Sequence, residues 1–242
     1  MFLIMIFAAT EKGRENMIKL ERTSVFNFEN AIRGMRNPMD SWDKSDSKIC
    51  GYDDQLYCEG SHSCKHASAL QSFCLGKNDL ALMHKLVQAG SDHRKFLRQI
   101  MVSVDITAPR YWWAEFDTYK VGTVANSCST MHTIHKRDLT LDDFSSEKLF
   151  DDAINGMYKD GFLTVIGLIN QARRKYNNTK DKKYWEVMIQ LLPTSFNQMR
   201  TVTLNYEVLL NQYHARKAHK LDEWRDYCDW VKSLPYFKEI CL

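Results

Sequence analysis

The stretch Ala108–His132, APRYWWAEFDTYKVGTVANSCSTMH, is the part of the sequence that decides the fold. Its first half is apolar and aromatic, and Pro109 suits the first turn of a buried helix through Phe116. Its second half is crowded with hydroxyl groups and adds a lysine, an amide, a thiol and a histidine. Several polar groups beside buried aromatic rings are typical of a ligand pocket. The alternative is that these hydroxyls only cap a helix or satisfy backbone groups in a turn.

The overall composition is that of an ordinary globular protein, with 242 residues and a formal net charge of +3. That charge is too small to indicate binding to nucleic acid or to an anionic membrane surface. The longest apolar run, Met1–Ala9, is shorter than a membrane span and lacks the basic leading region of a secretory signal. We therefore expect a cytoplasmic protein that binds neither membrane nor nucleic acid. A solvated basic face is expected at Arg94, Lys95 and Arg98.

Residues 1–16 are expected to be a non-native extension, with the true start at Met17. Codons for Lys12–Glu15 can form a purine-rich stretch like a bacterial ribosome-binding site, at a suitable distance before Met17. Residues 17–242 then form a single domain, because prolines are few and neither a low-complexity linker nor a repeat is present. Within this domain, residues 44–77 form an excursion rich in cysteine and histidine.

Hydrophobic periodicity predicts a helix-rich α+β fold with few strands. We expect a single domain around a small, mainly antiparallel sheet. Strands are expected just after Met17 and over 100–106. A helix over 79–90 is expected to have Asp79 as its N-cap and Gly90 at its end. Further helices are predicted over 92–99, 162–176, 181–192, 202–219 and 222–234.

Four of the seven cysteines lie in one short segment together with two histidines. Zinc is bound by four nitrogen or sulfur ligands, which short loops bring together. The spacing here differs from the paired C-x-x-C pattern of common zinc sites. We therefore favour reduced thiols in a surface excursion and expect no bound metal. The residues that a zinc ion would use are Cys58, His62, Cys64 and His66.

The polar half of Ala108–His132 has the donors that a phosphate or the edge of a nucleobase requires. Lys120 supplies a cation and Asn126 an amide, while the sequence has no glycine-rich phosphate loop and no nucleophile-elbow motif. A P-loop nucleotide site and a serine hydrolase are thus both disfavoured. The hydroxyl groups are those of Thr123, Ser127, Ser129 and Thr130.

The same stretch resembles the signature region of the flavin-dependent thymidylate synthases, the ThyX family. Those enzymes carry R-H-R-x-x-S-x-N-E-x-S-x-R, preceded at a fixed distance by an Ala-Pro pair that begins an aromatic helix. Here Ala108-Pro109 stands at that distance, and Thr118-Tyr119-Lys120 takes the place of R-H-R. The first histidine of an upstream His-x5-His pair is kept as His93. The later signature positions match Thr123, Asn126 and Ser129, with one extra residue near Ala125.

The C-terminal stretch from Leu192 to Tyr227, LPTSFNQMRTVTLNYEVLLNQYHARKAHKLDEWRDY, resembles the closing block of the same family. The two blocks occur in the family's order and cover roughly half of the chain. The match in the second block runs without a gap as far as Arg216. Its matching positions are Leu192, Pro193, Thr203, Asn205, Leu209, Asn211, Arg216, His219 and Glu223.

The resemblance implies the fold of the thymidylate synthase-complementing proteins, a homotetramer, and FAD bound between subunits. It implies methylation of the nucleotide dUMP with methylenetetrahydrofolate, with a flavin that is reduced by NADPH. Arg216 matches the family arginine that meets the uracil ring and is the catalytic candidate. The same resemblance implies that the cofactor is bound by His93, Lys120, Asn205 and Asn211. It implies that the nucleotide is bound by Arg216, Thr123, Asn126 and Ser129.

Several charged positions of the family pattern are changed in this chain. Met131 replaces the closing arginine of the signature, and Glu207 reverses a charge beside an anionic ligand. Two hypotheses therefore stand: an FAD-dependent methyltransferase of the thymidylate synthase type, and a non-catalytic nucleotide-binding or structural descendant of that fold. The remaining changes are Thr118, Tyr119 and Ile189, in place of an arginine, a histidine and an arginine.

Overall fold

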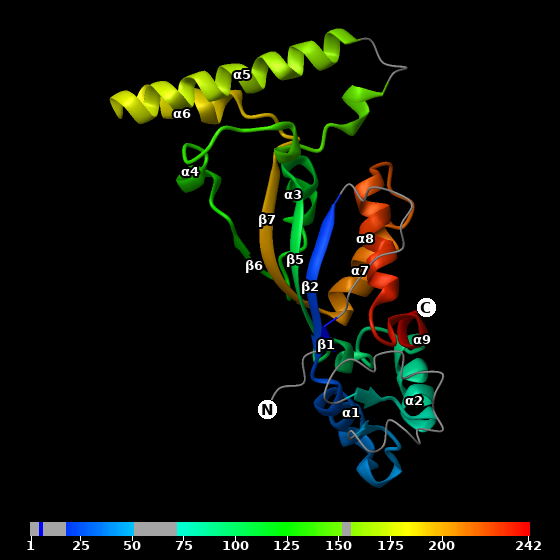
Figure 1. Ribbon diagram of the computed structural model, residues 1–242. Coiled ribbons are helices and arrows are strands. Elements are labelled where there is room, and N and C mark those ends of the chain that lie inside the picture. Colours follow the sequence, from blue (N-terminus) through cyan, green and yellow to red (C-terminus); the bar gives the residue numbers. More distant parts are fainter. Residues whose placement is uncertain (1–4, 7–17, 51–71, 152–155) are drawn as a thin grey trace. The chain divides into compact units, whose positions relative to one another are not determined.

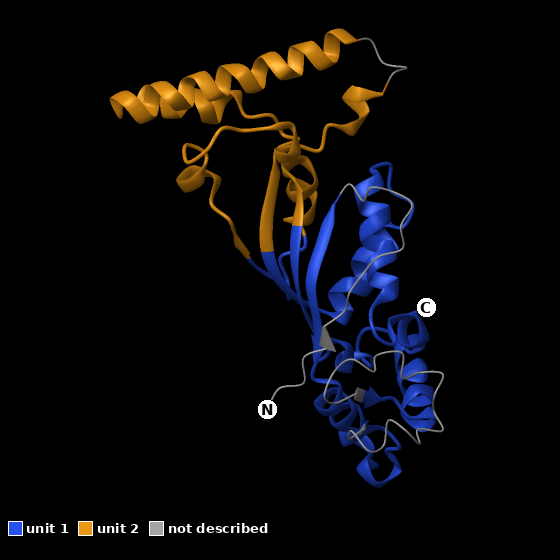
Figure 2. Cartoon of the chain, in the orientation of Figure 1, with its two compact units in different colours: residues 1–106, 119–125, 201–242 blue, residues 107–118, 126–200 orange. Residues whose placement is uncertain are grey.

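The computed structural model describes residues 5–6, 18–50, 72–151 and 156–242. The chain divides into two compact units, coloured blue and orange in Figure 2. Unit 1 comprises residues 1–106, 119–125 and 201–242, and unit 2 comprises residues 107–118 and 126–200.

The five-stranded sheet is made of segments from both ends of the chain and from its middle (Figure 1). The first two strands pair antiparallel, with Met5 opposite Val25. In β5 every second side chain from Val102 to Ile106 is buried, as the period of two in a strand requires. The predicted fold class, a helix-rich α+β fold with a small antiparallel sheet, is confirmed. The strand order is β1 (Met5–Ile6), β2 (Lys19–Phe26), β5 (Met101–Pro109), β7 (Asn197–Asn205) and β6 (Val124–Ser127).

Unit 1 holds most of the helices that surround the candidate site residues. The helix predicted over 222–234 forms as α8, and it buries one stripe of side chains that includes Trp224, Tyr227 and Val231. A second, two-stranded sheet pairs β3 (Lys48–Cys50) with β4 (Ser72–Cys74). The helices are α1 (Phe28–Arg36), α2 (Lys77–Gln88), α7 (Tyr206–Arg216), α8 (Asp222–Ser233) and α9 (Phe237–Cys241), and the 3-10 turns are η1 (Asn37–Met39), η2 (Trp42–Lys44) and η4 (Lys95–Arg98).

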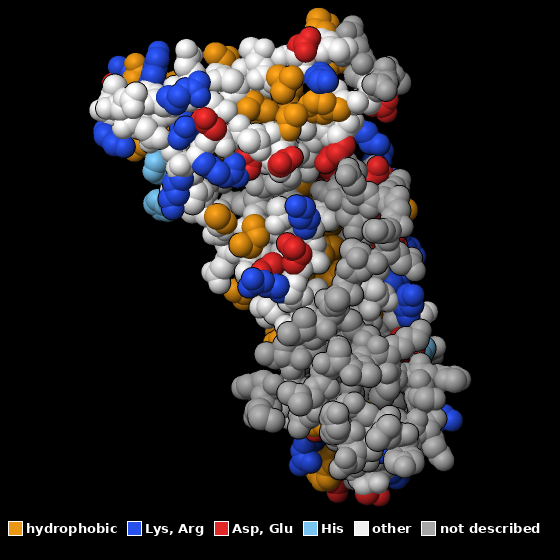
Figure 3. All heavy atoms as spheres, in the orientation of Figure 1, with side chains coloured by type: hydrophobic (Ala, Val, Ile, Leu, Met, Phe, Trp, Pro, Cys, Tyr) orange, Lys and Arg blue, Asp and Glu red, His pale blue; other side chains and the backbone are white. Residues whose placement is uncertain are grey.

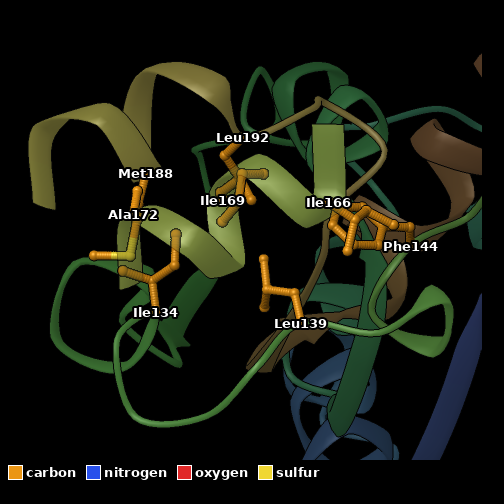
Figure 4. Packing of buried hydrophobic residues seen from close by; sticks show 8 residues of the cluster. All are labelled: Ile134, Leu139, Phe144, Ile166, Ile169, Ala172, Met188 and Leu192. Carbon is orange, nitrogen blue, oxygen red and sulfur yellow. The ribbon is translucent and has the colours of Figure 1, made fainter. Parts of the chain in front are cut away.

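Unit 2 is dominated by a hairpin of two helices, α5 (Gly156–Thr179) and α6 (Lys182–Leu191). The Asp181 side chain caps α6 by accepting the Lys183 N–H at 3.1 Å. Figure 4 shows Ile166 and Ile169 of α5 within the apolar core of the unit. The same core contains Ile134, Leu139, Phe144, Ala172, Met188 and Leu192, and the shorter elements are α3 (Arg110–Phe116), α4 (Thr130–Thr133), η5 (Leu141–Asp143) and η6 (Glu147–Phe150).

The opposite face of α5 is open, and apolar side chains lie on it. Met157, Leu163 and Leu168 are all exposed there, and Figure 3 shows hydrophobic side chains gathered over this part of the surface. None of the helices in the described ranges is both long enough and apolar enough to cross a membrane.

Three of the predicted elements are wrong in detail. Residues 202–205 continue strand β7, because Asn205 caps α7 and the helix therefore begins only at Tyr206. Asp79 does not cap α2 but is buried within it, and the Asp46 carboxylate accepts the backbone N–H groups of Asn78 and Asp79 instead. Over 92–99 only the short turn η4 forms.

Two of the predictions concern segments that the structure does not describe, wholly or in part. Cys58, His62, Cys64 and His66 all lie outside the described residues. Within the described part of the chain, no cluster of histidine, cysteine and carboxylate side chains has the make-up of a metal site. Of residues 1–16 only the strand Met5–Ile6 is described, and the start at Met17 stays a prediction.

Candidate functional site

The two sequence blocks that carry the family resemblance meet in unit 1, at the ends of helix α7. Arg216 is the last residue of α7, and its Nε donates a hydrogen bond to the Tyr119 hydroxyl at 2.8 Å. The Arg216 guanidinium carbon lies 4.7 Å from the centre of the Trp224 ring and 5.5 Å from that of Tyr119. These cation–π contacts fix the direction of the guanidinium. The catalytic candidate is therefore held in place by two aromatic rings.

The other end of α7 contacts the same segment of chain at Gly122. Gly122 has a φ of +77°, which glycine adopts without strain. A Cβ atom at Gly122 would lie 3.1 Å from the Asn205 Nδ2 and 3.1 Å from a Val208 methyl group. Residues 119–122 thus follow α7 from Arg216 to its N-terminus, and a Cβ atom at this turn would have to displace Asn205 or Val208 slightly.

Asn205 has a structural task in this arrangement. It is buried, and its Oδ1 accepts the Val208 N–H at 3.1 Å, which caps the N-terminus of α7. The amide oxygen of Asn205 is therefore already engaged in a hydrogen bond within the protein. The family resemblance predicts that Asn205 binds the flavin; the structure shows that its side chain determines where α7 begins.

Thr123 differs from the other hydroxyl residues of the segment. Its Oγ1 is buried, and the described residues offer it no hydrogen-bond partner. A buried hydroxyl without a partner costs free energy, which a partner from outside the chain would recover. Thr123 is therefore the predicted binding residue whose environment most directly indicates a missing partner.

Glu207 is paired with a cation, so the charge reversal expected from the sequence does not arise. Nε of Arg94 lies 3.0 Å and 3.2 Å from the two Glu207 carboxylate oxygens, and Nη2 lies 3.0 Å from Oε1. Arg94 also reaches Asn211, with 3.5 Å between Nη2 and Oδ1. The expected basic surface face is wrong for Arg94, which is partly buried, whereas Lys95 and Arg98 are exposed.

Three of the predicted cofactor-binding side chains are open to solvent. His93 follows the turn at Gly90, beside Arg94 in the chain, and its side chain is exposed. Asn211 is exposed on α7, and Lys120 is exposed between Tyr119 and Gly122. Among the described residues, Lys120 has no carboxylate partner. A cation, an imidazole and an amide are thus presented on unit 1 together with the buried Thr123 hydroxyl.

A buried hydrogen bond joins α7 and α8. The Tyr227 hydroxyl donates to the Gln212 Oε1 at 2.6 Å, and both residues are buried. Burial raises the pKa of Tyr227 well above its ordinary value, so the hydroxyl remains a donor. The contact ties α8 to α7 and supports the position of Trp224.

Asn126 and Ser129 belong to unit 2 and are described within it. Asn126 is exposed in β6, and Ser129 precedes the four-residue helix α4. The Ser129 carbonyl accepts a hydrogen bond from the Thr133 hydroxyl at 2.8 Å. Cys128, between them, is joined to β7 through its N–H, which donates to the Met199 carbonyl at 2.9 Å. The structure therefore places these two residues on a strand and a turn of unit 2.

The aromatic run of the opening stretch is a buried packing unit of unit 2. Trp113 is buried, and its Nε1 donates to the Gln198 carbonyl at 2.9 Å. The Arg200 guanidinium carbon lies 4.1 Å from the centre of the Trp113 ring, and Nη1 of Arg200 is 2.7 Å from the Asp117 carboxylate. Arg200 is therefore engaged with its own unit.

The clamp on Arg216 was missed at the level of sequence. In the sequence, Tyr119 stands out only as a departure from the family signature, and Trp224 only as an aromatic residue of the predicted helix over 222–234. Tyr119 and Trp224 are separated from Arg216 by 97 and by eight positions of sequence, respectively. Aromatic rings are more often core residues than ligand-site residues, so the pattern alone did not distinguish them.

No protein-family model matches the chain, and no curated protein matches it significantly in sequence. Solved structures match it in fold, and two of them are of the flavin-dependent thymidylate synthase ThyX from Helicobacter pylori with FAD and dUMP. The first has a TM-score of 0.59 and 16% identity, and covers 93% of this chain and 99% of the ThyX chain. The second has a TM-score of 0.60 and 14% identity, with coverages of 93% and 96%.

These matches define the class of fold. At identities of 14–16% the likeness concerns the fold and not the activity. The chain therefore has the fold of the flavin-dependent thymidylate synthases over nearly its full length. It shares that fold with the ThyX protein of Helicobacter pylori in its FAD- and dUMP-bound form.

Proposed function

We propose that the chain binds FAD and a pyrimidine nucleotide of the dUMP type and catalyses reductive methylation of that nucleotide. The observation that carries the proposal is the packing of residues 119–122 along α7, with Tyr119 on Arg216 and Gly122 against Asn205. This packing joins two blocks that are far apart in the sequence and that both resemble the same family. The fold shared with ThyX supports it.

The residues present fit an anionic dinucleotide such as FAD. Lys120 supplies a positive charge, and His93 and Asn211 supply hydrogen-bond donors on the exposed surface of unit 1. Thr123 has a buried hydroxyl that lacks a partner. His93, Lys120 and Asn211 would hold the cofactor together with Asn205, which also fixes the start of α7. The Thr123 hydroxyl would serve the nucleotide. When bound, FAD supplies the redox chemistry that the side chains of this chain lack.

Arg216 has the role of holding the pyrimidine ring. A guanidinium near a uracil carbonyl stabilises negative charge that develops on the ring when it is activated. The two aromatic rings beside Arg216 restrict its side chain before the substrate arrives, so less rotational freedom is lost on binding. The neutral Arg94–Glu207 pair removes a repulsive carboxylate from the same helix.

The remaining parts of the proposal rest on the family resemblance. Asn126 and Ser129 of unit 2 would contact the nucleotide, and methylenetetrahydrofolate and NADPH would be the co-substrates. A homotetramer in the cytoplasm would be the working form. A sedimentation measurement on the purified chain tests the tetramer.

The proposal is tested by FAD and dUMP binding with the Arg216→Ala variant. We expect the wild-type chain to bind FAD with a changed flavin absorption spectrum, and dUMP to perturb that spectrum. In Arg216→Ala, dUMP binding weakens by about 10- to 100-fold, because a charged hydrogen bond is lost. Lys217→Ala is the matched control, since Lys217 directly follows Arg216 in the sequence and its cation is exposed. Failure of the folded wild-type chain to bind FAD would contradict the proposal.

A non-catalytic nucleotide-binding protein is the second candidate. The observation in its favour is that Arg216, Arg94 and Asn205 are each already engaged by groups of the protein. Growth of a thymidine auxotroph that expresses the chain separates the two. Growth supports the enzyme, and FAD and nucleotide binding without growth or turnover supports the binding protein.

A further inference from the structure

A cavity of about 200 Å³ lies in unit 1 among residues that the proposed function does not use. One wall is a single face of α1, where Glu29, Ile32, Arg33 and Arg36 recur at helical spacing. The facing wall comes from η2, β3 and β4 and the turn between η2 and β3. Three cations and one carboxylate line the cavity, with apolar side chains between them.

Arg36 is the buried charge of this cavity. Its side chain is only 5% exposed, with Nε donating to the Asp79 Oδ1 at 2.7 Å and Nη1 to the Ser41 carbonyl at 3.2 Å. The described residues provide no acceptor for Nη2. A guanidinium has five N–H groups, and a carboxylate or phosphate is the partner that suits them best. Arg36 therefore retains donor capacity in a nearly closed environment.

The hydroxyl groups of the cavity are oriented by the same carboxylate. Ser45 and Ser47 donate to the Asp79 Oδ2 at 2.8 Å and 2.6 Å. Both hydroxyls line the cavity as well. The Ser47 oxygen in turn accepts the Gly76 N–H at 2.9 Å. The polar part of the cavity is thus set before a ligand enters.

Trp42 supplies a flat apolar wall that is fixed from two sides. The Arg33 guanidinium carbon lies 5.1 Å from the centre of the Trp42 ring, and the indole Nε1 donates to the Asn37 Oδ1 at 2.8 Å. Phe73 and Ile32 add further apolar surface. A held aromatic ring beside excess positive charge suits a ligand with a flat ring and an anionic group.

We infer that this cavity binds a small planar carboxylate, with its ring against Trp42 and its carboxylate on Arg36 and the rim cations Arg33 and Lys48. Its volume matches a molecule of one ring with a short acidic group. The inference does not depend on the proposed function, because none of the residues assigned to FAD or dUMP lines the cavity.

The test uses sodium benzoate as the probe with the full chain in phosphate-free buffer. Ligand-observed NMR and tryptophan fluorescence measure its affinity, and benzamide is the neutral match of the same shape. We expect saturable binding of benzoate and binding of benzamide that is at least about fivefold weaker, because the charged hydrogen bonds are lost. Inorganic phosphate alone should compete weakly, since it has no ring.

One variant fills the cavity, and a second removes a positive charge from its rim. Ile32→Trp places a larger side chain in the space and should weaken benzoate binding by at least about tenfold. Leu163→Trp, on the exposed face of α5, makes the matched change elsewhere and should leave it unaltered. If Ile32→Trp does not fold, Arg33→Gln at the exposed rim replaces it, with a loss of about threefold. Absence of benzoate binding, equal affinity for benzamide, or unchanged binding in the folded variant would overturn the inference.

Discussion

Two arginine–carboxylate pairs of unit 1 are similar in chemistry and different in surroundings. Arg36 and Asp79 are 5% and 0% exposed, and Asp79 accepts further hydrogen bonds from Ser45, Ser47 and the Asp46 N–H. Arg94 and Glu207 are 20% and 10% exposed, and their main contacts are with each other. The first pair is the centre of a buried network, and the second is an almost isolated pair near the surface.

The difference shows why a buried charge must be judged by its whole environment. Transfer of Asp79 from water costs free energy, and five donors to its oxygens offset that cost. Glu207 keeps some contact with water, so its smaller desolvation cost is offset by the hydrogen bonds from the Arg94 guanidinium alone. Removal of the Asp79 carboxylate is therefore expected to lower the free energy of unfolding far more than removal of the Glu207 carboxylate.

The largest effect is expected for Asp79→Ala. Removal of the carboxylate leaves the Arg36 charge buried and uncompensated, and it strands the two serine hydroxyls. We expect the free energy of unfolding to fall by about 3–5 kcal/mol, measured by urea denaturation. Asp43→Ala is the control, because Asp43 is an exposed acid in η2, and it should change stability by less than about 0.5 kcal/mol. A loss at Asp79 as small as that of the control would refute the network.

The same carboxylate predicts a dependence of stability on pH. Burial alone would raise the pKa of Asp79, but hydrogen bonds from Ser47, Ser45 and Arg36 outweigh it and lower the pKa below 3.8. The stabilisation is complete above the unfolded-state pKa and is lost as the pH falls through the lower folded-state value. The stability difference between wild type and Asp79→Asn should therefore be constant from pH 7 to about 4 and shrink below it. A difference that grows on acidification would contradict the direction of the shift.

Local structure was largely predictable from the sequence. The helix after Pro109, the α5–α6 hairpin and the buried stripe of α8 follow from periodicity and from proline and asparagine positions. The boundary between β7 and α7 was not, because Val202, Tyr206 and Leu209 recur at helical spacing and extend the apparent helix into the strand until the Asn205 cap is recognised. Pairing with a neighbouring strand in the folded sheet decides whether such a segment becomes a strand or a helix.

The family resemblance proposes members for the candidate site, but it does not give the partners of their side chains within the fold. The family resemblance brought Arg216, Lys120 and Asn205 together on residue type and order. It did not reveal that Arg94 neutralises Glu207, because the two residues are 113 positions apart and no local pattern links them. A substitution that reverses a charge in a sequence need not reverse the charge of the folded site.

The smallest effect is expected at the second pair, in Glu207→Gln. The amide keeps the size of the side chain but loses the charge, while Arg94 retains contact with water and with Asn211. We expect a loss of about 1–2 kcal/mol in the free energy of unfolding. The double variant Arg94→Gln, Glu207→Gln should lose less than the sum of the two single variants, because the second change removes an already unpaired group. If the two losses of unfolding free energy simply add, Arg94 and Glu207 do not interact. Arg36–Asp79 would then be the only one of the two pairs that acts as a pair.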